Sequence, residues 1–212
     1  MTGASSERVL VRPMSEQDIA EVVRVHLEAF PGFFLSELGP GFLRQFYRGF
    51  LCADGIALVA VEADAGKVCA ATAGAMQPAW FFSRLLVQRW WAFGLAALPT
   101  LARRPSILPR LLRAIRYRGD APSEPGGALW STLQVRPGFH GRGIGRRLAK
   151  AFLQEAEQRG ARYVYAFVDA DNERTIRLHR SLGFKSAERL FTPEAREMVR
   201  LALRFGPPSP GQ

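Results

Sequence analysis

A glycine-rich loop stands between an apolar, strand-like run at 129–135 and a helix-like pattern that begins at Ile144. The loop glycines are Gly138, Gly141, Gly143 and Gly145. Strand, loop and helix start in this order present backbone N–H groups at the positive end of a helix dipole, which favours an anion such as a pyrophosphate. Glycine lets such an anion approach the backbone closely. A plain turn would also use glycine, and the loop has neither the ending of a P-loop nor the spacing of a dinucleotide-binding motif.

The residues after the loop predict a long amphipathic helix that ends near Gly160. Its apolar side chains recur every four residues, at Ile144, Leu148, Phe152 and Ala156. Three arginines add positive charge beside its start: Arg142, Arg146 and Arg147.

A second strand-like run at 162–168 is followed by a helix pattern that Asn172 opens and Gly183-Phe184 closes. With both stretches in view, the chain resembles the GNAT superfamily of N-acetyltransferases. The family's acetyl-CoA motif, Q/R-x-x-G-x-G/A, stands here as HGRGIG at 140–145. Its later motif, N-x-x-A-I-x-L-Y-x-x-L-G-F, stands here as NERTIRLHRSLGF at 172–184. Two motifs in this order, with a strand between them, are a strong signal.

Three positions depart from the family pattern. His140 replaces the usual Gln or Arg, Thr175 the usual Ala, and His179 the usual Tyr. The change at His140 could weaken phosphate binding, and the positive charge of Arg142 could compensate for that loss. The last changes the residue at the position of the family's general acid.

The resemblance implies that acetyl-CoA is the cosubstrate and that its pantetheine arm lies between two splayed strands, here 129–135 and 162–168. It also implies that backbone groups of the first strand bind the arm, that amides at 141–146 bind the pyrophosphate, and that Asn172 helps to place the cofactor. The implied cofactor-binding residues are Leu133, Val135, His140, Gly141, Arg142, Gly143, Ile144, Gly145, Arg146 and Asn172.

The resemblance places His179 at the general-acid position. A protonated imidazole could deliver a proton to the departing thiolate, and its ordinary pKa of about 6.5 would make this step sensitive to pH. The alternative is that His179 only positions the cofactor by hydrogen bonding or packing. The general base is left open among Glu28, Glu37, Glu62 and a water chain.

The length of 212 residues suggests one domain, and the resemblance places it at 8–205, with flexible tails at 1–7 and 206–212. The implied fold is α/β: a mixed, mostly antiparallel sheet of about seven strands flanked by helices. A capping box at Ser15 and Asp18 opens an early helix. A second helix is expected at 42–52, and the remaining strands at 8–12, 56–62, 67–76, 185–190 and 197–205.

The composition of the chain limits which kinds of protein it can be. A hydrophobic content of 48% and a charged content of 23% are ordinary for a soluble globular protein. The net charge of +10 suits acidic partners such as CoA phosphates, nucleic acid or anionic lipid. It is equally explained by a surface rich in arginine, and no nucleic-acid partner is expected.

Cys52 and Cys69 stand outside any ligand cluster, so no metal site is predicted. The two thiols and the lack of a signal-peptide pattern favour a cytoplasmic location.

Residues 78–127 are predicted to form a helical insert between the third and fourth strands. The part at 78–118 is rich in Trp and Phe and has eight arginines and no acidic residue. Pro99, Pro105 and Pro109 are expected to divide it into short helical pieces. This pattern favours a substrate lid or a dimer surface, and with the latter a homodimer. Contact with a membrane is a less favoured alternative, and extra core is a third.

These observations predict an acetyl-CoA-dependent N-acetyltransferase that acts on a primary amine, in the first place that of a small molecule. One alternative is a protein or peptide N-acetyltransferase of the same fold. Another is a non-catalytic acyl-CoA-binding or membrane-associated module that uses the basic aromatic insert. The sequence does not name the acceptor amine.

Overall fold

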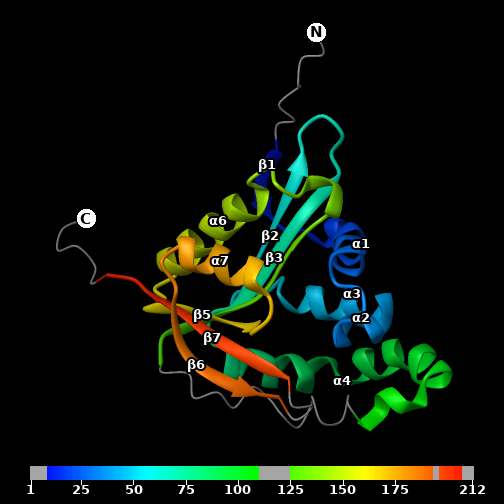
Figure 1. Cartoon of the computed structure of the whole chain (residues 1–212). Helices are drawn as coiled ribbons and strands as arrows, with labels where there is room; N and C mark the ends of the chain where they lie inside the picture. Colours follow the sequence, from blue (N-terminus) through cyan, green and yellow to red (C-terminus); the bar gives the residue numbers. More distant parts are fainter. Residues whose placement is uncertain (1–8, 110–124, 193–195, 207–212) are drawn as a thin grey trace.

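Seven strands form one mixed sheet in the part of the chain that the computed structural model describes, residues 9–109, 125–192 and 196–206 (Figure 1). In spatial order they are β1 (Val9–Pro13), β2 (Gly55–Glu62), β3 (Val68–Ala75), β4 (Gly127–Val135), β5 (Tyr163–Asp169), β7 (Glu197–Arg204) and β6 (Lys185–Phe191). All neighbouring pairs are antiparallel except β4 and β5. The predicted mixed, mostly antiparallel sheet is therefore confirmed. The predicted tails lie outside the described residues apart from Gly206, as does part of the insert, 110–124.

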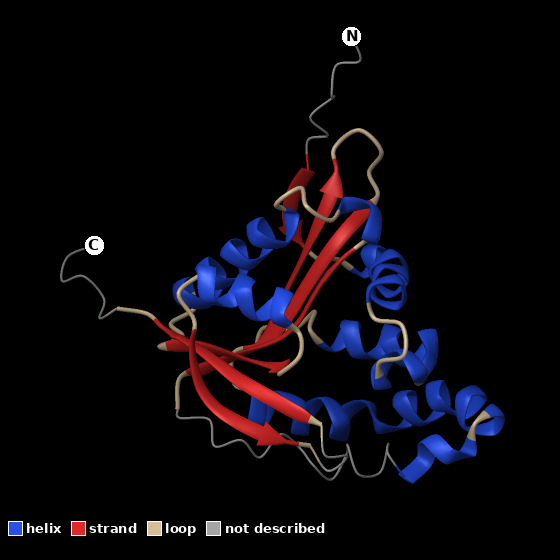
Figure 2. Ribbon diagram, viewed as in Figure 1, coloured by secondary structure: helices blue, strands red, loops and turns tan. Residues whose placement is uncertain are grey.

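Helices cover both faces of this sheet (Figure 2). One face carries α1 (Ile19–Ala29), α2 (Phe34–Glu37) and α3 (Gly39–Gly49), and the other carries α6 (Ile144–Gln158) and α7 (Glu173–Ser181). Successive residues of a strand point to opposite faces. Leu58 of β2 therefore belongs to the core under α6, and its neighbour Val59 belongs to the core under α1 and α3.

The glycine loop and the helix after it form as the sequence predicts. A short 3₁₀ turn, η3 (Pro137–Phe139), leads into the loop, and Gly143 stands just before α6 with a φ of 73°. The apolar positions of the predicted stripe are all buried: Ile144, Leu148, Phe152 and Ala156. Gly160 follows the helix with a φ of 84°, the left-handed geometry that favours glycine at a helix end.

The N-terminal capping box also forms. Ser15 and Asp18 exchange hydrogen bonds across η1 (Glu16–Asp18), which leads directly into α1. The guanidinium of Arg12 donates two hydrogen bonds to Asp18, at 2.7 and 2.8 Å. These bonds to the charged carboxylate lower the pKa of Asp18 to about 2. The start of α1 is thereby tied to β1.

Helix α3 begins earlier and ends earlier than the predicted 42–52. Pro40 lies in its first turn, where a helix needs no N–H partner, so the Gly-Pro-Gly run starts the helix instead of interrupting the chain. Gly49, the last residue of α3, lets α4 approach closely, because a Cβ there would lie 2.6 Å from the Leu85 side chain. Cys52 follows the helix and is exposed.

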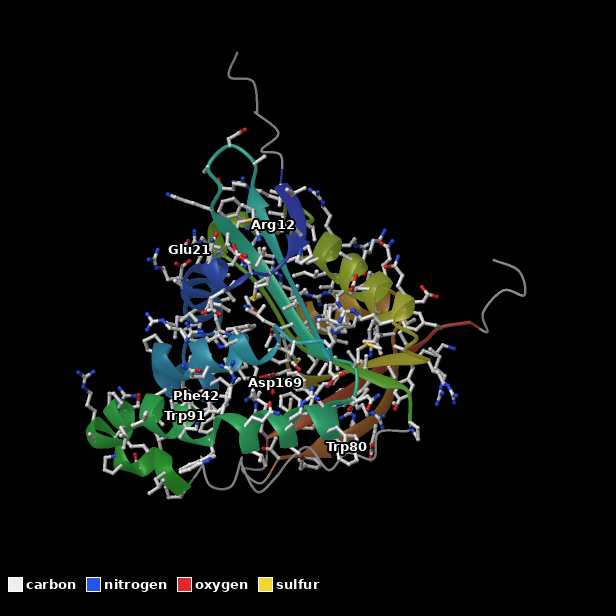
Figure 3. The ribbon with its side chains drawn as sticks, turned by 180° about the vertical axis from the view of Figure 1, so that it is seen from behind. Arg12, Glu21, Phe42, Trp80, Trp91 and Asp169 are labelled. Atoms are coloured by element: carbon white, nitrogen blue, oxygen red, sulfur yellow. The ribbon has the colours of Figure 1, made fainter. Side chains whose placement is uncertain are left out.

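The insert is dominated by a long helix, α4 (Pro78–Arg103), followed by η2 (Pro105–Ile107). Its backbone leaves helical geometry at Arg89, with a φ of −123° and a ψ of 16°. Contrary to the prediction, the helix continues through Pro99. It packs along α3, where the hydroxyl of Thr100 donates to the Leu38 carbonyl at 3.0 Å, and this packing supports the helix past the proline. Figure 3 shows α4 along one edge of the molecule.

Candidate active site

Strands β4 and β5 pair over three positions and then separate. The paired residues are Gly127 with Tyr163, Ala128 with Val164, and Leu129 with Tyr165. Beyond this point β4 continues beside β3, whereas β5 pairs along its full length with β7. The separation leaves the second half of β4 with one edge that has no neighbouring strand among the described residues.

The backbone at this open edge can bind an extended ligand. The N–H of Arg136 donates to the Cys69 carbonyl of β3 at 2.8 Å. Alternate residues of a strand direct their backbone groups to opposite edges. Leu133 and Val135 therefore direct theirs toward the open edge. One acceptor there is already used, because the Nε2–H of His140 donates to the Val135 carbonyl at 2.8 Å.

The open edge leads to a cavity of about 370 Å³ at the start of α6. Gly141 and Gly143 have φ values of 79° and 73°, and a Cβ on either would meet nothing within 4 Å, so an anion could approach the backbone. The first N–H groups of a helix have no partner within it. Arg146 and Arg174 line the same cavity and bring positive charge. The arrangement suits the phosphates of a nucleotide-like ligand.

A second cavity, of about 340 Å³, lies beside the first. The two share four lining residues: Phe30, Leu133, Asn172 and Thr175. Within the described chain, seven buried side-chain polar atoms have no hydrogen-bond partner, and five of them belong to residues that line this second cavity. They are the Nε2 atoms of His26 and His179, the hydroxyls of Ser131 and Thr132, and Oδ1 of Asp169. Because buried polar groups are almost always paired in native proteins, this concentration indicates a site for a polar ligand.

His179 is held in one orientation on α7. Its Nδ1–H donates to the Thr175 carbonyl at 2.8 Å, so the neutral ring has its lone pair on Nε2. The ring lies 4.8 Å from the Trp130 ring and 5.0 Å from that of Phe184, measured between centroids. Burial lowers the pKa of His179 below its ordinary value. At neutral pH, Nε2 is therefore unprotonated and available as a hydrogen-bond acceptor, whereas the predicted general acid would begin with a proton there.

His26 reaches the second cavity from α1. Its Nδ1 pairs with the Tyr47 hydroxyl at 2.7 Å, and that hydroxyl also accepts a bond of 2.7 Å from the Gln134 amide. Burial lowers the pKa of His26 to about 4 and raises that of Tyr47. This buried chain links a residue of the second cavity to Gln134, which lines the first.

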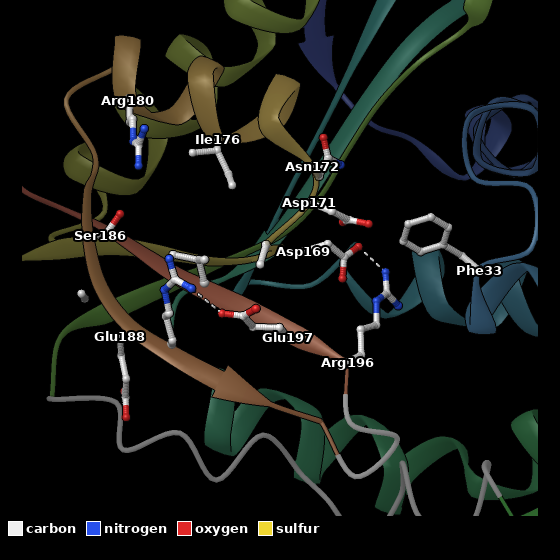
Figure 4. Close-up of a pocket in the computed structure, with 14 residues that line it drawn as sticks. Phe33, Asp169, Asp171, Asn172, Ile176, Arg180, Ser186, Glu188, Arg196 and Glu197 are labelled. Atoms are coloured by element: carbon white, nitrogen blue, oxygen red, sulfur yellow. Dashed lines mark hydrogen bonds and ion pairs between the residues drawn. The ribbon is translucent and has the colours of Figure 1, made fainter.

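Asp169 supplies a carboxylate at the end of β5 (Figure 4). One of its oxygens accepts a hydrogen bond from Arg196, whose guanidinium also lies over the Phe33 ring at 5.0 Å. The other oxygen, Oδ1, is buried and has no partner in the described structure. Phe33, Asp169 and Arg196 line the second cavity and, together with Asn172, also line an open groove of about 1100 Å³ between α7 and the β6–β7 pair. Phe33, Arg196 and Asp169 thus stand between the second cavity and the groove.

Comparison with known proteins identifies the class of this site. The sequence profile of the acetyltransferase (GNAT) family matches residues 73–184. This range includes β4, α6, β5 and α7, which line the two cavities. The chain belongs to the GNAT acetyltransferase family. Members of this family use acetyl-CoA. The GNAT resemblance drawn from the two motifs is therefore confirmed.

Relatives with curated names match parts of this GNAT chain. The L-methionine sulfoximine/L-methionine sulfone acetyltransferase of Salmonella typhimurium is 38% identical over 75 residues, 35% of this chain and 39% of that protein. N-alpha-acetyltransferase RimI of Mycobacterium tuberculosis is 46% identical over 54 residues, 26% of this chain and 32% of that protein. The chain thus spans less than half the length of the curated relatives that it matches.

Solved structures show the same fold. The yncA protein of Salmonella typhimurium, solved with its cofactor acetyl-CoA, has a TM-score of 0.59 and 16% identity, and the match covers 92% of this chain and 93% of that one. The ribosomal-protein-alanine N-acetyltransferase of Brucella melitensis has a TM-score of 0.62 and 17% identity, covering 92% and 99%. These likenesses support the fold that the sheet order and the separated strands already define.

The structure brings together nearly all of the residues that the resemblance implied for the cofactor. Nine of the ten line the first cavity: Leu133, Val135, His140, Gly141, Gly143, Ile144, Gly145, Arg146 and Asn172. The tenth, Arg142, instead lies over the Phe139 ring at 4.9 Å. Gly145 faces the open strand, since a Cβ there would lie 3.4 Å from Val135. The residues present therefore fit acetyl-CoA: a glycine cradle at a helix start continues into an open strand edge.

The carboxylates proposed as bases are not at this site. Glu28, Glu37 and Glu62 line neither cavity, and Glu28 pairs with Arg136 at 3.0 Å. The carboxylate that does line the second cavity is Asp169, which sequence reasoning missed. A signal for it existed, because Asp169 directly follows the predicted strand 162–168 and precedes the motif that begins at Asn172. His26, which the sequence does not mark as a site residue, is buried and also lines the cavity.

Proposed function

We propose that the chain transfers an acetyl group from acetyl-CoA to the primary amine of a small molecule that also carries a carboxylate, as an amino acid does. The observation that carries this proposal is the cluster of five unpaired buried polar atoms around a cavity next to the glycine cradle. When bound, acetyl-CoA supplies the acetyl thioester. The chain's own residues bind and orient the two substrates and transfer the protons.

The first cavity binds the cofactor in this proposal. The N–H groups at the start of α6 receive the pyrophosphate, and the open edge at Leu133 and Val135 receives the amides of the pantetheine arm. A backbone N–H of this edge would donate a hydrogen bond to the acetyl carbonyl, where negative charge develops during acyl transfer. His140 and Arg174 fix the loop through a contact of 3.3 Å between their side chains.

His179 manages a proton in this proposal. Its neutral Nε2 accepts a proton that the acceptor amine releases and returns one to the departing sulfur. Its Nδ1–H bond to Thr175 holds the ring so that Nε2 is the atom available for this exchange. A neutral imidazole of lowered pKa takes up a proton only transiently, which suits a carrier.

Asp169 and Arg196 select the acceptor in this proposal. The unpaired Oδ1 of Asp169 receives the ammonium group, and Arg196, already beside Asp169, receives a carboxylate. Aromatic walls at Phe30, Phe33 and Phe34 leave room for an apolar side chain. The Salmonella relative that acts on methionine sulfoximine and methionine sulfone supports an acceptor of amino-acid size.

A peptide acceptor is the second candidate function. The observation that favours it is the open groove of about 1100 Å³, which continues from the second cavity past Phe33 and Arg196. A chain whose terminal amine enters the cavity would leave along this groove. The RimI relative of Mycobacterium tuberculosis supports this alternative.

Release of free thiol from acetyl-CoA tests both functions. The acceptor panel contains apolar L-amino acids, their methyl esters, and peptides that begin with the same residues. We expect the free amino acids to have the highest kcat/KM, about tenfold above the esters, because an ester lacks the charge that Arg196 pairs with. Arg196→Gln should remove this preference. Faster turnover of the peptides would select the second function, and no thiol release with any amine would reject catalysis.

A further inference from the structure

The outward face of α4 is unusually apolar. Within the described chain, seven of the ten large hydrophobic side chains that are exposed lie at 80–108. They include three tryptophans, Trp80, Trp90 and Trp91, which are 78%, 71% and 58% exposed. A surface helix normally presents polar residues on the side away from its core. An exposed patch of this kind marks an interaction surface.

The exposed residues form a stripe along the helix. After the break at Arg89, Trp91, Leu95 and Leu98 follow one another at intervals of four and three residues, so they share one side of that part of the helix. Before the break, Trp80 and Val87 are seven residues apart and likewise share one side. The opposite side carries Phe81, Leu85 and Phe93, which belong to the core with α3. Figure 3 shows Trp80 and Trp91 well apart along α4. None of the stripe lines either active-site cavity, which differs from the predicted substrate lid.

Positive charge accompanies the stripe. The described part of the segment, 78–109, has four arginines and no acidic residue: Arg84, Arg89, Arg103 and Arg104. A groove of about 990 Å³ between α3 and α4 is lined by Arg44, Arg48 and Arg89 together with Trp91 and Leu95 of the stripe. Its one acidic lining residue is Glu16, which pairs with Arg48. Apolar and cationic side chains therefore lie beside one another at this surface.

We propose that this surface, α4 with the arginine-lined groove beside it, docks on an anionic lipid bilayer. An amphipathic helix with tryptophan and leucine on one face and arginines beside it lies in the plane of the headgroups. Tryptophan favours this interface because its ring is apolar and its N–H is polar. The arginines of the groove receive lipid phosphates. Among the described residues, no helix has the length and apolar character to cross the bilayer, so α4 rests on the surface.

The charges favour a bilayer over a second copy of the chain. A symmetric dimer would bring the same surface of each subunit together. The groove arginines Arg44, Arg48 and Arg89 would then lie close to their own copies, and the described part of the segment, 78–109, offers no carboxylate to separate them. Like charges placed against each other across an interface oppose association. An anionic bilayer meets the arginines with the opposite sign.

Tryptophan fluorescence of the full-length protein tests the proposal directly. The chain has four tryptophans; three lie exposed on α4 and the fourth, Trp130, is 4% exposed in the core. The probes are vesicles of phosphatidylcholine alone and vesicles with about one third phosphatidylglycerol. We expect a blue shift and co-flotation with the anionic vesicles, both reversed by high salt. Unchanged emission and no flotation would overturn the proposal.

Matched variants test whether vesicle binding depends on this surface or is nonspecific. Trp80→Ser with Trp91→Ser should weaken vesicle binding at least about tenfold, because both rings lose their interfacial contact. Leu10→Ser is the control: Leu10 is 59% exposed and belongs to β1, a strand that lies away from α4 (Figure 1), so its loss should leave binding unchanged. Arg44→Gln should weaken binding about fivefold, the effect of one basic residue at an anionic surface.

Sedimentation velocity tests whether a second copy of the chain, instead of a bilayer, covers this surface. If the wild-type chain is a dimer that the tryptophan pair of substitutions converts to a monomer, and anionic vesicles bind neither form, the surface is a dimer interface and the lipid proposal fails. Circular dichroism should show the native fold in every variant, because each substituted side chain is exposed. Acetyl-CoA binding should be unaffected throughout, since none of these residues lines the cofactor cavity.

Discussion

Replacement of His179 by phenylalanine should separate activity from stability. The unpaired Nε2 of this buried imidazole costs about 1–3 kcal/mol of folding free energy. Its Nδ1–H bond to Thr175 contributes about 1 kcal/mol. Phenylalanine has nearly the same shape and keeps the ring contacts with Trp130 and Phe184. The free energy of unfolding should therefore stay the same or rise by up to about 2 kcal/mol, the difference between the two contributions.

The same substitution should lower kcat by about 10²–10⁴-fold, the usual contribution of a group that moves a proton. Urea denaturation measures the stability, steady-state thiol release measures kcat, and calorimetric titration with CoA shows whether the cofactor still binds. Phe184→Leu is the matched control, since it disturbs the same ring cluster but keeps the imidazole. It should lose stability and keep kcat within a few-fold.

Two results would refute this reasoning about His179. An unchanged kcat in a stable His179→Phe variant would leave the histidine with a packing role alone. A loss of more than about 3 kcal/mol of stability would contradict this reasoning, because an imidazole whose Nε2 has no partner has no interaction of that size to lose.

Three further predictions concern the cofactor loop, the acceptor cavity and acid stability. Gly143→Asp should abolish CoA binding by calorimetry, whereas Gly66→Asp, with the same left-handed backbone in the distant β2–β3 hairpin, should not. Asp169→Asn should lower kcat/KM for amines by at least about tenfold and leave CoA binding unchanged, and equal kcat/KM values would reject its role. The pKa of His26 is lowered to about 4, so its contribution to stability is complete above pH 6.5 and is lost as pH falls toward 4, up to about 3 kcal/mol. His26→Gln should flatten that part of the urea-derived stability profile, and an unchanged slope would argue against a buried neutral imidazole.

Local pattern alone predicted much of the framework. The four-residue repeat from Ile144 to Ala156 reports which side of a helix is apolar, and that information lies within one segment of chain. The capping box at Ser15 and Asp18 is likewise a contact between near neighbours. The glycine loop was readable for the same reason, because the helix start and the glycines that expose its amides are consecutive.

Tertiary structure decided what no local pattern contains. The separation of β4 from β5 depends on β7, which arrives about thirty residues later and pairs with β5 instead. The meeting of Asp169 with Arg196 and Phe33 joins three distant parts of the chain, and so does the link from His26 through Tyr47 to Gln134. On α4, the sequence shows aromatic residues on every side and cannot say which are covered. Only the packing of α3 settles that, since it buries one side and leaves the tryptophans on the other exposed.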